Sequence, residues 1–473
     1  MILRFRRIFS LLIVLLPLIS MAQDYSSYYT ELPVPLKQAV APVIPDNSVQ
    51  LTDFGAVGDG MTLCTEAFEK AISKLNKLGG GHLNVPQGVW LTGPIALKDN
   101  IDLHLDKNAV IYFSPDKSLY VDEDENGRVY ACIRASKRKN ISITGEGVID
   151  GNGAQWRPVK RSKVSDVEWK RFKSLGGEER DNGSLWYPWN VKGGYPNISE
   201  DPVMQEGRRN DLVRFTNCEN VLFKGVTFQN SPRFHVHPCN CRNVIADNIT
   251  IRCPWNAQNG DGLDLSDCQQ CLIVNSTVNV GDDGLCMKSG KDKGDKALVN
   301  GCSDILIENN VVFHAHGGFV VGSEDITLMR NIVVRKCRFS ETDTGLRFKS
   351  GIGRGGKTEN IYISDVFMTD ITDEAIVVQC DYQNLHAGAK AEEFKLPKNP
   401  QFVPEFTGIH IENVVCRGCN TAIRMVGIET LDCVHDIELK NVSIVYNKKA
   451  REIDDKTTRN IIMENVRLTE DKK

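Results

Sequence analysis

The chain contains 473 residues, of which 41% are hydrophobic, and its 57 basic and 61 acidic side chains give a net charge of −4. A charge of this sign argues against a general polyanion-binding surface, so nucleic acid is not an expected partner. If the ligand is acidic, a few cations placed in a cleft must attract it.

The first 22 residues have the pattern of an export signal. A basic start precedes an apolar run over Ile8–Ile19, which is shorter than the roughly 20 residues of a membrane span, and Ala22 ends a small-residue cleavage site. We favour this reading over a membrane anchor because no stop-transfer pattern follows. The sequence predicts a signal peptide over residues 1–22, an N-terminal extension over 23–48, and a periplasmic or extracellular protein without membrane attachment after cleavage.

The fifteen cysteines are an odd number, so at least one must stay unpaired within the chain. Two Cys-x-x-Cys pairs, Cys268/Cys271 and Cys416/Cys419, lack nearby histidines at zinc-finger spacing. We expect buried cysteines that act as small core residues and no metal site, and we leave disulfide pairing open.

A short phrase recurs along most of the chain and predicts a solenoid. It consists of a polar residue, once glycine, followed by Ile or Val and alternating apolar positions. Many of its intervals are 23–29 residues, a period typical of repeat proteins. The copies are Asn140-Ile141, Asn220-Val221, Asn243-Val244, a looser Cys271-Leu272, Asp304-Ile305, Asn331-Ile332, Asn360-Ile361, Gly408-Ile409, Asp436-Ile437 and Asn460-Ile461.

A second phrase, a small residue followed by an apolar one, runs half a repeat out of step with the first. Two short β-rich segments per repeat, separated by Gly and Asn turns, favour a right-handed parallel β-helix over a β-sandwich or a propeller. We expect one all-β domain over residues 49–473, with an insertion over about 153–210. The copies are Gly262-Leu263, Gly284-Leu285, Gly318-Phe319, Gly345-Leu346, Ala375-Ile376 and Ala422-Ile423.

Thr65–Leu78 is the one segment with convincing helical periodicity, and Gly79–Gly81 follows it as a stop signal. We expect this helix to cap the first coil, whose core would otherwise be exposed. Four apolar residues fall on one face, namely Phe68, Ile72, Leu75 and Leu78.

The second phrase gives a register for three carboxylates. Asp261 stands two residues before Leu263, and Asp283 stands two residues before Leu285. If the two leucines are equivalent, these aspartates are neighbours at the about 4.8 Å spacing of stacked coils, with Asp282 beside them.

Further along the chain, His316 precedes Phe319 by three residues, close to the same edge, and Arg347 and Lys349 share one strand face. Clustered carboxylates repel one another, which raises at least one pKa and keeps an acid protonated. The two cations can hold a substrate carboxylate, Arg347 through a bidentate fork. The set predicts hydrolysis of an anionic sugar polymer.

Each residue also has a plainer interpretation. Asp and Gly are common at coil corners, and we interpret Asp264 and Asp267 in this way. A calcium site is the main alternative for Asp282 and Asp283. His316 alone would pass as a structural histidine, so the hypothesis depends on the common position of these residues in the stack.

The same segments resemble the four signatures of polygalacturonases of glycoside hydrolase family 28. All four occur in order, and the resemblance covers roughly Val49 to the C-terminus. In this sequence they stand as Asn259-Gly260-Asp261, Gly281-Asp282-Asp283, Ala315-His316-Gly317 and Arg347-Phe348-Lys349. Two further stretches resemble bacterial members that act on chain ends, Asn230-Ser231-Pro232 leading to His237-Pro238, and Lys288-Ser289-Gly290.

The resemblance implies hydrolysis of α-1,4-galacturonosidic bonds in pectin with inversion, without a cofactor. By position, Asp282 is the general acid, Asp261 and Asp283 activate the attacking water, and His316 supports the acid or binds substrate. The implied substrate-binding residues are Arg347, Lys349, Asn259, Lys288 and His237. Gly260 and Ala315 depart from the family pattern, which has Thr and Gly there.

The expected insertion is rich in aromatic residues, which suit sugar stacking but equally suit anchoring the loop to the body. A long loop can also close one end of a groove and cause exo action. The aromatics are Trp156, Trp169, Trp186, Tyr187, Trp189 and Tyr195.

Four functions compete at this stage. An exo-acting galacturonan hydrolase leads, and a hydrolase of rhamnogalacturonan or another pectic glycan is its variant within the family. A calcium-dependent eliminase resembling pectate lyase comes next, because we see no arginine base beside the acids. A glycan-binding β-helix without catalysis comes last. Oligomeric state is left open.

Overall fold

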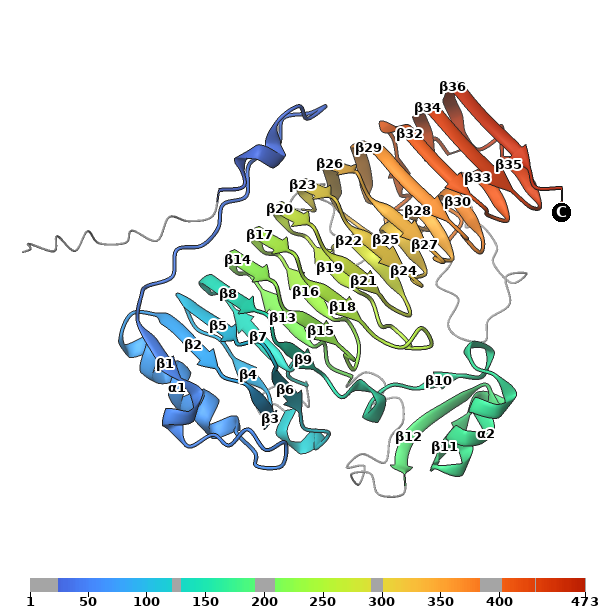
Figure 1. Cartoon of the computed structure of the whole chain (residues 1–473). Helices are drawn as coiled ribbons and strands as arrows, with labels where there is room; N and C mark the ends of the chain where they lie inside the picture. Colours follow the sequence, from blue (N-terminus) through green and yellow to red (C-terminus); the bar gives the residue numbers. More distant parts are fainter. Residues whose placement is uncertain are drawn as a thin grey trace, which may run out of the picture.

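A computed structural model describes residues 24–120, 129–191, 209–290, 301–382, 402–429 and 431–472. The expected signal peptide lies outside these residues. The chain winds into a parallel β-helix whose coils stack from the N-terminal end (blue) to the C-terminal end (red) in Figure 1. Its parallel crossovers are right-handed, as the twist of β-strands dictates. The predicted fold class is confirmed.

Three ladders of parallel strands run the length of the stack. The first ladder contains β1 (Ser48–Gln50), β2 (Gly81–Val85), β5 (Ile101–Leu105), β8 (Lys139–Gly145), β14 (Glu219–Lys224), β17 (Arg242–Asp247), β20 (Gln269–Val274), β23 (Ser303–Glu308), β26 (Leu328–Arg335), β29 (Lys357–Thr369), β32 (Ile409–Arg417), β34 (His435–Tyr446) and β36 (Arg459–Glu470), with β31 (Glu405–Phe406) beside β29.

The second ladder contains β3 (Gly88–Thr92), β6 (Ala109–Phe113), β9 (Val148–Asp150), β15 (Thr227–Gln229), β18 (Thr250–Arg252), β21 (Thr277–Asn279), β24 (Val311–Phe313) and β27 (Arg338–Ser340), and continues into the later halves of β29, β32, β34 and β36. The third ladder contains β4 (Ile95–Ala96), β7 (Ile133–Ser136), β13 (Val213–Thr216), β16 (Val236–Cys239), β19 (Leu263–Ser266), β22 (Asp283–Ser289), β25 (Gly317–Asp325), β28 (Thr344–Lys349), β30 (Glu374–Gln379), β33 (Thr421–Val426) and β35 (Lys449–Ile453).

The expected two strands per repeat are therefore three in most coils. The first phrase opens strands of the first ladder, and the second phrase opens strands of the third. The second ladder was missed because several of its strands have only three residues, as in Thr227–Gln229, too few for alternation to be read from sequence.

The polar residue of the first phrase has a conformational reason. Asn140, Asn220 and Asn243 have φ of 54°, 58° and 58°, in the left-handed region that Asn tolerates better than most residues. Their amides also stack along the helix: Asn220 donates to Asn140 Oδ1 at 2.8 Å, and Asn243 donates to Asn220 Oδ1 at 2.8 Å. The repeat is thus set by a bend and a hydrogen-bonded ladder.

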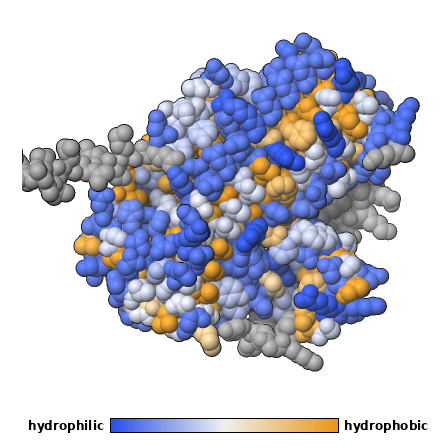
Figure 2. Space-filling view, in the orientation of Figure 1, coloured by the Kyte–Doolittle hydropathy of each residue, from blue (hydrophilic) through white to orange (hydrophobic). Residues whose placement is uncertain are grey.

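The core fills the inside of the coils with apolar side chains, while the face shown in Figure 2 is largely hydrophilic with smaller apolar patches. All fifteen cysteines are free thiols; Cys253 is half-buried and the other fourteen are buried. Their expected role as small core residues is confirmed. No helix among the described residues is long and apolar enough to cross a membrane.

The predicted capping helix is α1 (Thr65–Lys77), which buries Phe68, Ile72 and Leu75. Leu78 was expected on this face but is 47% exposed, because the helix ends at the preceding residue. Short 3-10 turns η1 (Ser26–Tyr29), η2 (Leu51–Phe54) and η3 (Lys117–Tyr120) also lie in this half of the chain.

Residues 24–47 run along the outside of the first ladder. Val40 donates its backbone N–H to Asn243 Oδ1 at 2.7 Å, and Tyr25 donates to Asp247 Oδ2 at 3.1 Å. The segment covers outward apolar side chains of successive coils, and together they form a second core cluster. Its buried members are Tyr25, Ala39, Ala41, Ile245, Leu272, Val274, Leu306 and Val333.

An insertion between β9 and β13 stands beside the stack in Figure 1. A second helix, which the sequence analysis missed, lies within it, and its capping box of Ser165 and Glu168 is a signal that could have found it. The elements are η5 (Gly153–Gln155), β10 (Val159–Lys160), η6 (Arg161–Lys163), α2 (Asp166–Ser174), β11 (Gly176–Arg180), η7 (Asp181–Gly183) and β12 (Leu185–Val191).

Candidate active site

The third ladder brings the predicted aspartates together. Leu263 of β19 pairs with Leu285 of β22, and the N–H of Gly262 donates to the carbonyl oxygen of Asp283 at 2.9 Å. Asp261 and Asp283 therefore occupy equivalent positions on neighbouring coils. The register deduced from the second phrase agrees with the structure.

Asp283 is held by the two cations expected to bind substrate. Lys349 Nζ lies 2.7 Å from Asp283 Oδ2, and Arg347 Nη1 lies 3.4 Å from Oδ1. Both cations come from β28, where they alternate with the inward-pointing Leu346 and Phe348. The shared strand face predicted from their spacing places both within reach of one carboxylate.

Asp282 contacts His316 of the next coil. His316 Nδ1 lies 3.0 Å from Asp282 Oδ1, and the N–H of His316 donates to the carbonyl oxygen of Asp282 at 2.9 Å. On the other side of the ring, Lys163 donates from Nζ to His316 Nε2 at 2.8 Å. Lys163 belongs to the insertion and was not identified from the sequence.

Asp261 lies in a separate cluster around Lys288. Lys288 donates to Asp261 Oδ2 at 3.0 Å, and its Nζ also lies 2.8 Å from Asp264 Oδ1. The ammonium group lies over the ring of Phe234, 4.3 Å from its centroid. Asp264 was interpreted as a turn residue, but it is a fully buried strand residue of β19 that shares a lysine with Asp261.

The Lys288 cluster retains unsatisfied acceptors. Among the described residues, Asp261 Oδ1 and Asp264 Oδ2 lack a hydrogen-bond donor, while Asp264 Oδ1 lies 2.8 Å from Lys288 Nζ. Buried carboxylate oxygens without donors are costly, so this cluster favours a bound proton, a water molecule or a ligand hydroxyl.

The four carboxyl groups differ in pKa. Burial raises the pKa of Asp261 well above its usual value, with opposition from Lys288 and support from the neighbouring carboxylates. Burial likewise raises the pKa of Asp264 against the attraction of Lys288. For Asp282, burial is outweighed by the hydrogen bond from His316 and by nearby charges that include Lys349 and Lys163, so its pKa is lowered. For Asp283, burial is outweighed by Lys349 and Arg347, and its pKa is lowered.

Asn259 and His237 lie close to this site but are engaged by protein groups. Asn259 Oδ1 accepts from Arg209 Nη2 at 2.8 Å. His237 is 6% exposed, and its Nδ1 and Nε2 lie 2.9 Å from Asp211 Oδ2 and 3.0 Å from Ser266 Oγ. The structure thus places His237 as a buried support of the third ladder, without a ring nitrogen open to a sugar.

The glycine at position 260 is explained by packing. A Cβ built there would lie 2.9 Å from Cβ of Ala257 and 3.0 Å from Sγ of Cys253. The turn that contains these two residues fills the space that the threonine of the resembled pattern would need. It also passes close to Gly281, where a Cβ would lie 2.6 Å from the carbonyl oxygen of Trp255.

The insertion's aromatics are largely buried. Trp156 packs edge-on against Tyr120, with ring centroids 5.2 Å apart. Trp169 and Trp186 belong to a small core of the insertion itself, and Tyr187 is also buried. Anchoring to the body fits Trp156, whereas Trp169 and Trp186 pack within the insertion; Tyr195 lies outside the described residues and the side chain of Trp189 is not described. An exposed tryptophan lies elsewhere, since Trp255, on the turn beside Gly281, is 53% exposed.

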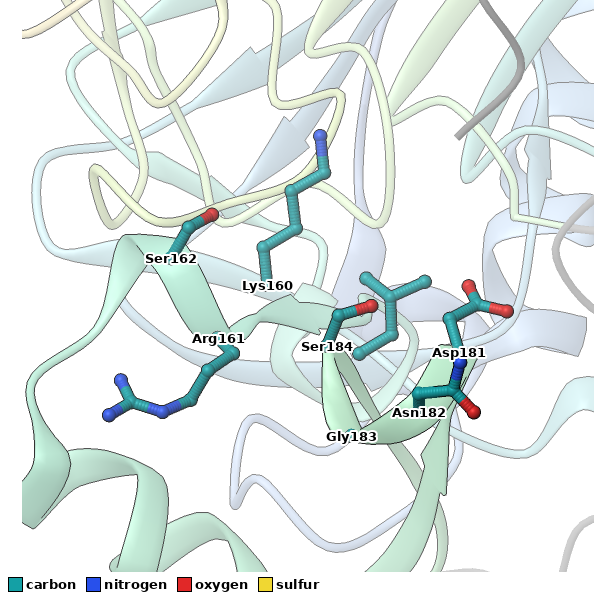
Figure 3. Close-up of a pocket in the computed structure, with 8 residues that line it drawn as sticks. Lys160, Arg161, Ser162, Asp181, Asn182, Gly183 and Ser184 are labelled. Atoms are coloured by element: carbon teal, nitrogen blue, oxygen red, sulfur yellow. The ribbon is translucent and has the colours of Figure 1, made fainter. Parts of the chain in front are cut away.

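A cavity of about 890 Å³ lies within the insertion (Figure 3). Its walls come from the β10–η6 segment and from the turn that joins β11 to β12. Arg161 and Ser162 line it, and the next residue is Lys163, which reaches His316. None of the acids of the site lines this cavity. Its lining residues are Lys160, Arg161, Ser162, Asp181, Asn182, Gly183, Ser184 and Leu185.

The calcium alternative has a geometric basis. One ligand atom each from Asp282, Asp283 and His316 lies within 4.8 Å of the others. However, Lys349 and Arg347 already neutralise Asp283, and Lys163 occupies His316 Nε2. A divalent cation among three protein cations would be repelled, so this donor set fits calcium poorly.

Comparisons with known proteins agree with this site. A "Probable polygalacturonase" of Vitis vinifera is 28% identical over 423 residues, which cover 86% of this chain and 76% of that protein. An "Exo-poly-alpha-D-galacturonosidase" of Dickeya chrysanthemi is 26% identical over 422 residues, which cover 82% of this chain and 65% of that protein.

The crystal structure of a hyperthermoactive exopolygalacturonase from Thermotoga maritima matches with a TM-score of 0.69 and 30% identity, over 90% of this chain and 94% of that chain. Residues 197–462, more than half of the chain, match the sequence profile of glycosyl hydrolases family 28. This chain is a member of glycosyl hydrolases family 28.

Proposed function

We propose that this protein hydrolyses α-1,4-galacturonosidic bonds of pectic galacturonan, with inversion and from the chain end. The observation that carries the proposal is the stacking of Asp261 and Asp283 on neighbouring coils beside Asp282, with Lys349 and Arg347 paired to Asp283. Carboxyl groups supply an acid and a base, and the cations match the charge of a uronic acid. Relatives named as polygalacturonases and exo-acting galacturonosidases support the same substrate.

The proposed division of labour follows the family pattern. Asp282 protonates the oxygen of the leaving sugar, while Asp261 and Asp283 bind and activate the water that attacks the anomeric carbon from the opposite side. His316 donates a hydrogen bond to Asp282 and orients it. Arg347 and Lys349 bind the substrate carboxylate next to the cleaved bond.

The electrostatics of the free protein add a requirement to this scheme. The pKa of Asp282 is lowered and that of Asp261 is raised, so in the free protein the proton favours Asp261. Asp282 must therefore gain its proton when substrate binds. A uronate carboxylate beside Lys349 and Arg347 adds negative charge and excludes water, and both effects raise the pKa of Asp282.

The test compares two substrates in two variants. An aryl galacturonide with an acidic leaving group needs little help from a general acid, whereas oligogalacturonide needs it fully. Asp282→Asn is expected to lose about 10²- to 10⁴-fold in kcat on oligogalacturonide and much less on the aryl substrate. Asp261→Asn is expected to lose activity on both.

Product analysis completes the test. Proton NMR of the first product should show the β-anomer from the α-linked substrate, and chromatography should show monomer from the start of digestion. An unsaturated, ultraviolet-absorbing product would indicate elimination, and wild-type activity of Asp282→Asn on oligogalacturonide would reject the assigned acid.

Exo action is proposed from the insertion. It stands beside the coils that carry the acids and contacts them directly, because Lys163 donates to the carbonyl oxygen of Gly281 at 2.9 Å. An insertion placed against one end of the acid cluster leaves room for the terminal sugar but obstructs a polysaccharide that extends past the cleaved bond on both sides. Release of mixed oligomers from the start of digestion would contradict this point.

We also propose that the protein is exported and that its signal peptide is cleaved between Ala22 and Gln23. The basic start and the short apolar run support this, and the substrate lies outside the cell. N-terminal sequencing of the secreted protein should begin at Gln23.

A further inference from the structure

Lys163 links the insertion directly to the residues around Asp282. Its Nζ lies 2.8 Å from His316 Nε2 and 2.9 Å from the carbonyl oxygen of Gly281. Gly281 directly precedes Asp282, and His316 contacts Asp282. The ammonium group of Lys163 therefore contacts both the residue that precedes Asp282 and the histidine that contacts its carboxylate.

The donors and acceptors at His316 fix its tautomer. An ammonium group has only donors, so His316 Nε2 must present its lone pair to Lys163. The ring proton of a neutral imidazole then sits on Nδ1, which lies 3.0 Å from Asp282 Oδ1 and donates to it. Both contacts are satisfied together only by the neutral Nδ1–H form.

The segment that carries Lys163 is held in place. Arg161, two residues earlier, donates to the carbonyl oxygen of Val164 at 2.8 Å and also bonds Asp166, which closes η6 onto the start of α2. At the base of the insertion, the buried Arg157 donates to Asn230 Oδ1 at 2.9 Å and to the carbonyl oxygen of Ser231. These bonds tie the insertion to a coil turn, so Lys163 is positioned in advance of substrate.

We propose that Lys163 is a positioning residue, supplied by the insertion, that holds His316 as the neutral Nδ1–H tautomer and thereby orients Asp282. The proposal rests on the proposed role of Asp282 as general acid. Without Lys163, Nε2 is free to take a proton and turn its donor toward Asp343, whose Oδ2 lies 3.7 Å away. A charged imidazolium would stabilise the Asp282 anion and lower its pKa, which leaves a smaller fraction of Asp282 protonated and able to act as the acid.

The environment of Lys163 agrees with this role. Burial lowers the pKa of its ammonium group, and the charges of Asp282 and Asp343 partly restore it. Burying an ammonium group costs free energy, so the contacts of Lys163 must compensate for that cost. Lys160, whose charge acts on Lys163, lines the cavity instead.

The experiment uses the full chain with three variants at one position and one control. Lys163→Met removes the donor, Lys163→Gln keeps a shorter polar group, and Lys163→Arg keeps a cationic donor. Lys170→Met, on the exposed face of α2, is the matched control, since it removes an equal charge from the same insertion. Thermal unfolding of each variant shows whether it is folded.

The two readouts separate positioning from substrate binding. With oligogalacturonide, Lys163→Met should lower kcat by about 10- to 100-fold, a part of what a positioned acid contributes, with little change in KM. Nitrogen-15 NMR of labelled histidine should show His316 as the Nδ1–H form in the wild type and a protonated or mixed ring in Lys163→Met. Lys163→Arg should restore both, while Lys163→Gln should lie between.

The NMR measurement needs no substrate, so it tests the proposal even if the protein acts on another glycan. Unchanged His316 signals in Lys163→Met and Lys163→Gln would overturn it. A rise in KM alone, with kcat at the wild-type level, would overturn it as well and make Lys163 a substrate contact.

Discussion

Lys349 and Asp283 form a nearly buried ion pair at the candidate site, with their Nζ and Oδ2 atoms 2.7 Å apart and side chains only 7% and 4% exposed. The lysine expected to bind a substrate carboxylate is thus engaged by a carboxylate of the protein. Substrate must share this ammonium group with Asp283. The two expected roles, base activation and substrate binding, are coupled through one cation.

Replacing Lys349 tests this coupling. Burial already acts to raise the pKa of Asp283, and Lys349 is the main group that lowers it. Lys349→Met should therefore raise this pKa, so the acidic limb of the kcat/KM profile should move to higher pH, because the base protonates earlier. Removing one partner of a buried pair should also cost about 3–5 kcal/mol of stability. Lys349→Arg is the control, and an unmoved acidic limb in Lys349→Met would contradict the argument.

Asp264 should prove functional rather than a turn residue. Its charge is among those that raise the pKa of Asp261, and both groups share Lys288. Asp264→Asn leaves Lys288 to Asp261 alone, so the pKa of Asp261 should fall and the pH optimum should shift downward. A pH–rate profile on oligogalacturonide checks this, with Asp267→Asn for comparison. Identical pH–rate profiles for Asp264→Asn and the wild type would show that Asp264 does not influence catalysis.

Asp325 predicts a pH-dependent stability that is independent of catalysis. Burial raises its pKa to about 8, against a hydrogen bond from Thr358 and the charge of Arg354. A carboxyl group whose pKa is raised on folding contributes its full stability below about pH 4, and this is lost as the pH rises through about 8. Asp325→Asn should therefore flatten the fall in Tm between about pH 5 and about pH 9. Parallel Tm curves for the two proteins would refute this.

The N-terminal segment should stabilise the stack from outside. Deleting residues 24–41 would expose Ile245, Leu272 and the other outward apolar side chains that it covers. We expect a lower Tm and binding of a hydrophobic dye, with unchanged kcat per folded molecule. Tyr25→Phe, which loses only the bond to Asp247, should cost about 0.5–3 kcal/mol. A deletion variant with wild-type Tm would show that the segment contributes no stability.

Trp255 is expected to be a sugar-stacking platform beside the acids. It is exposed, and its backbone contacts Gly281, the residue before Asp282. Trp255→Ala should raise KM by about 3- to 10-fold, since an aromatic contact is worth about 0.5–1.5 kcal/mol. Trp255→Phe should recover most of the loss. Fluorescence titration with trigalacturonate would show no quenching if Trp255 does not contact sugar.

Much of the fold was predictable because the repeat has a local cause. A residue at each bend must accept a left-handed φ, so Asn, Asp or Gly recurs at Asn140, Asp304 and Gly408. The small residue of the second phrase must fit against packed neighbours; at Gly318 a Cβ would lie 2.3 Å from the ring of Phe339. Such constraints recur at the same position of successive coils and are visible as spacing.

Other features escaped because they depend on segments far apart in the chain. Lys163 lies 153 residues from His316, and no period connects an insertion to the repeat. The sequence around Asp264 resembles that of a corner turn. Only its contact with Lys288 of the next coil makes it part of the site. Nothing in the sequence near His237 indicates that its two ring nitrogens contact Asp211 and Ser266.

The sequence by itself determined the coil register, and with it that Asp261 and Asp283 are stacked neighbours, because one strand spacing relates every coil to the next. Only the tertiary structure decided which cation holds each acid and where the proton prefers to be. Those properties come from burial and from charges brought in by other coils and by the insertion, and no local pattern encodes them.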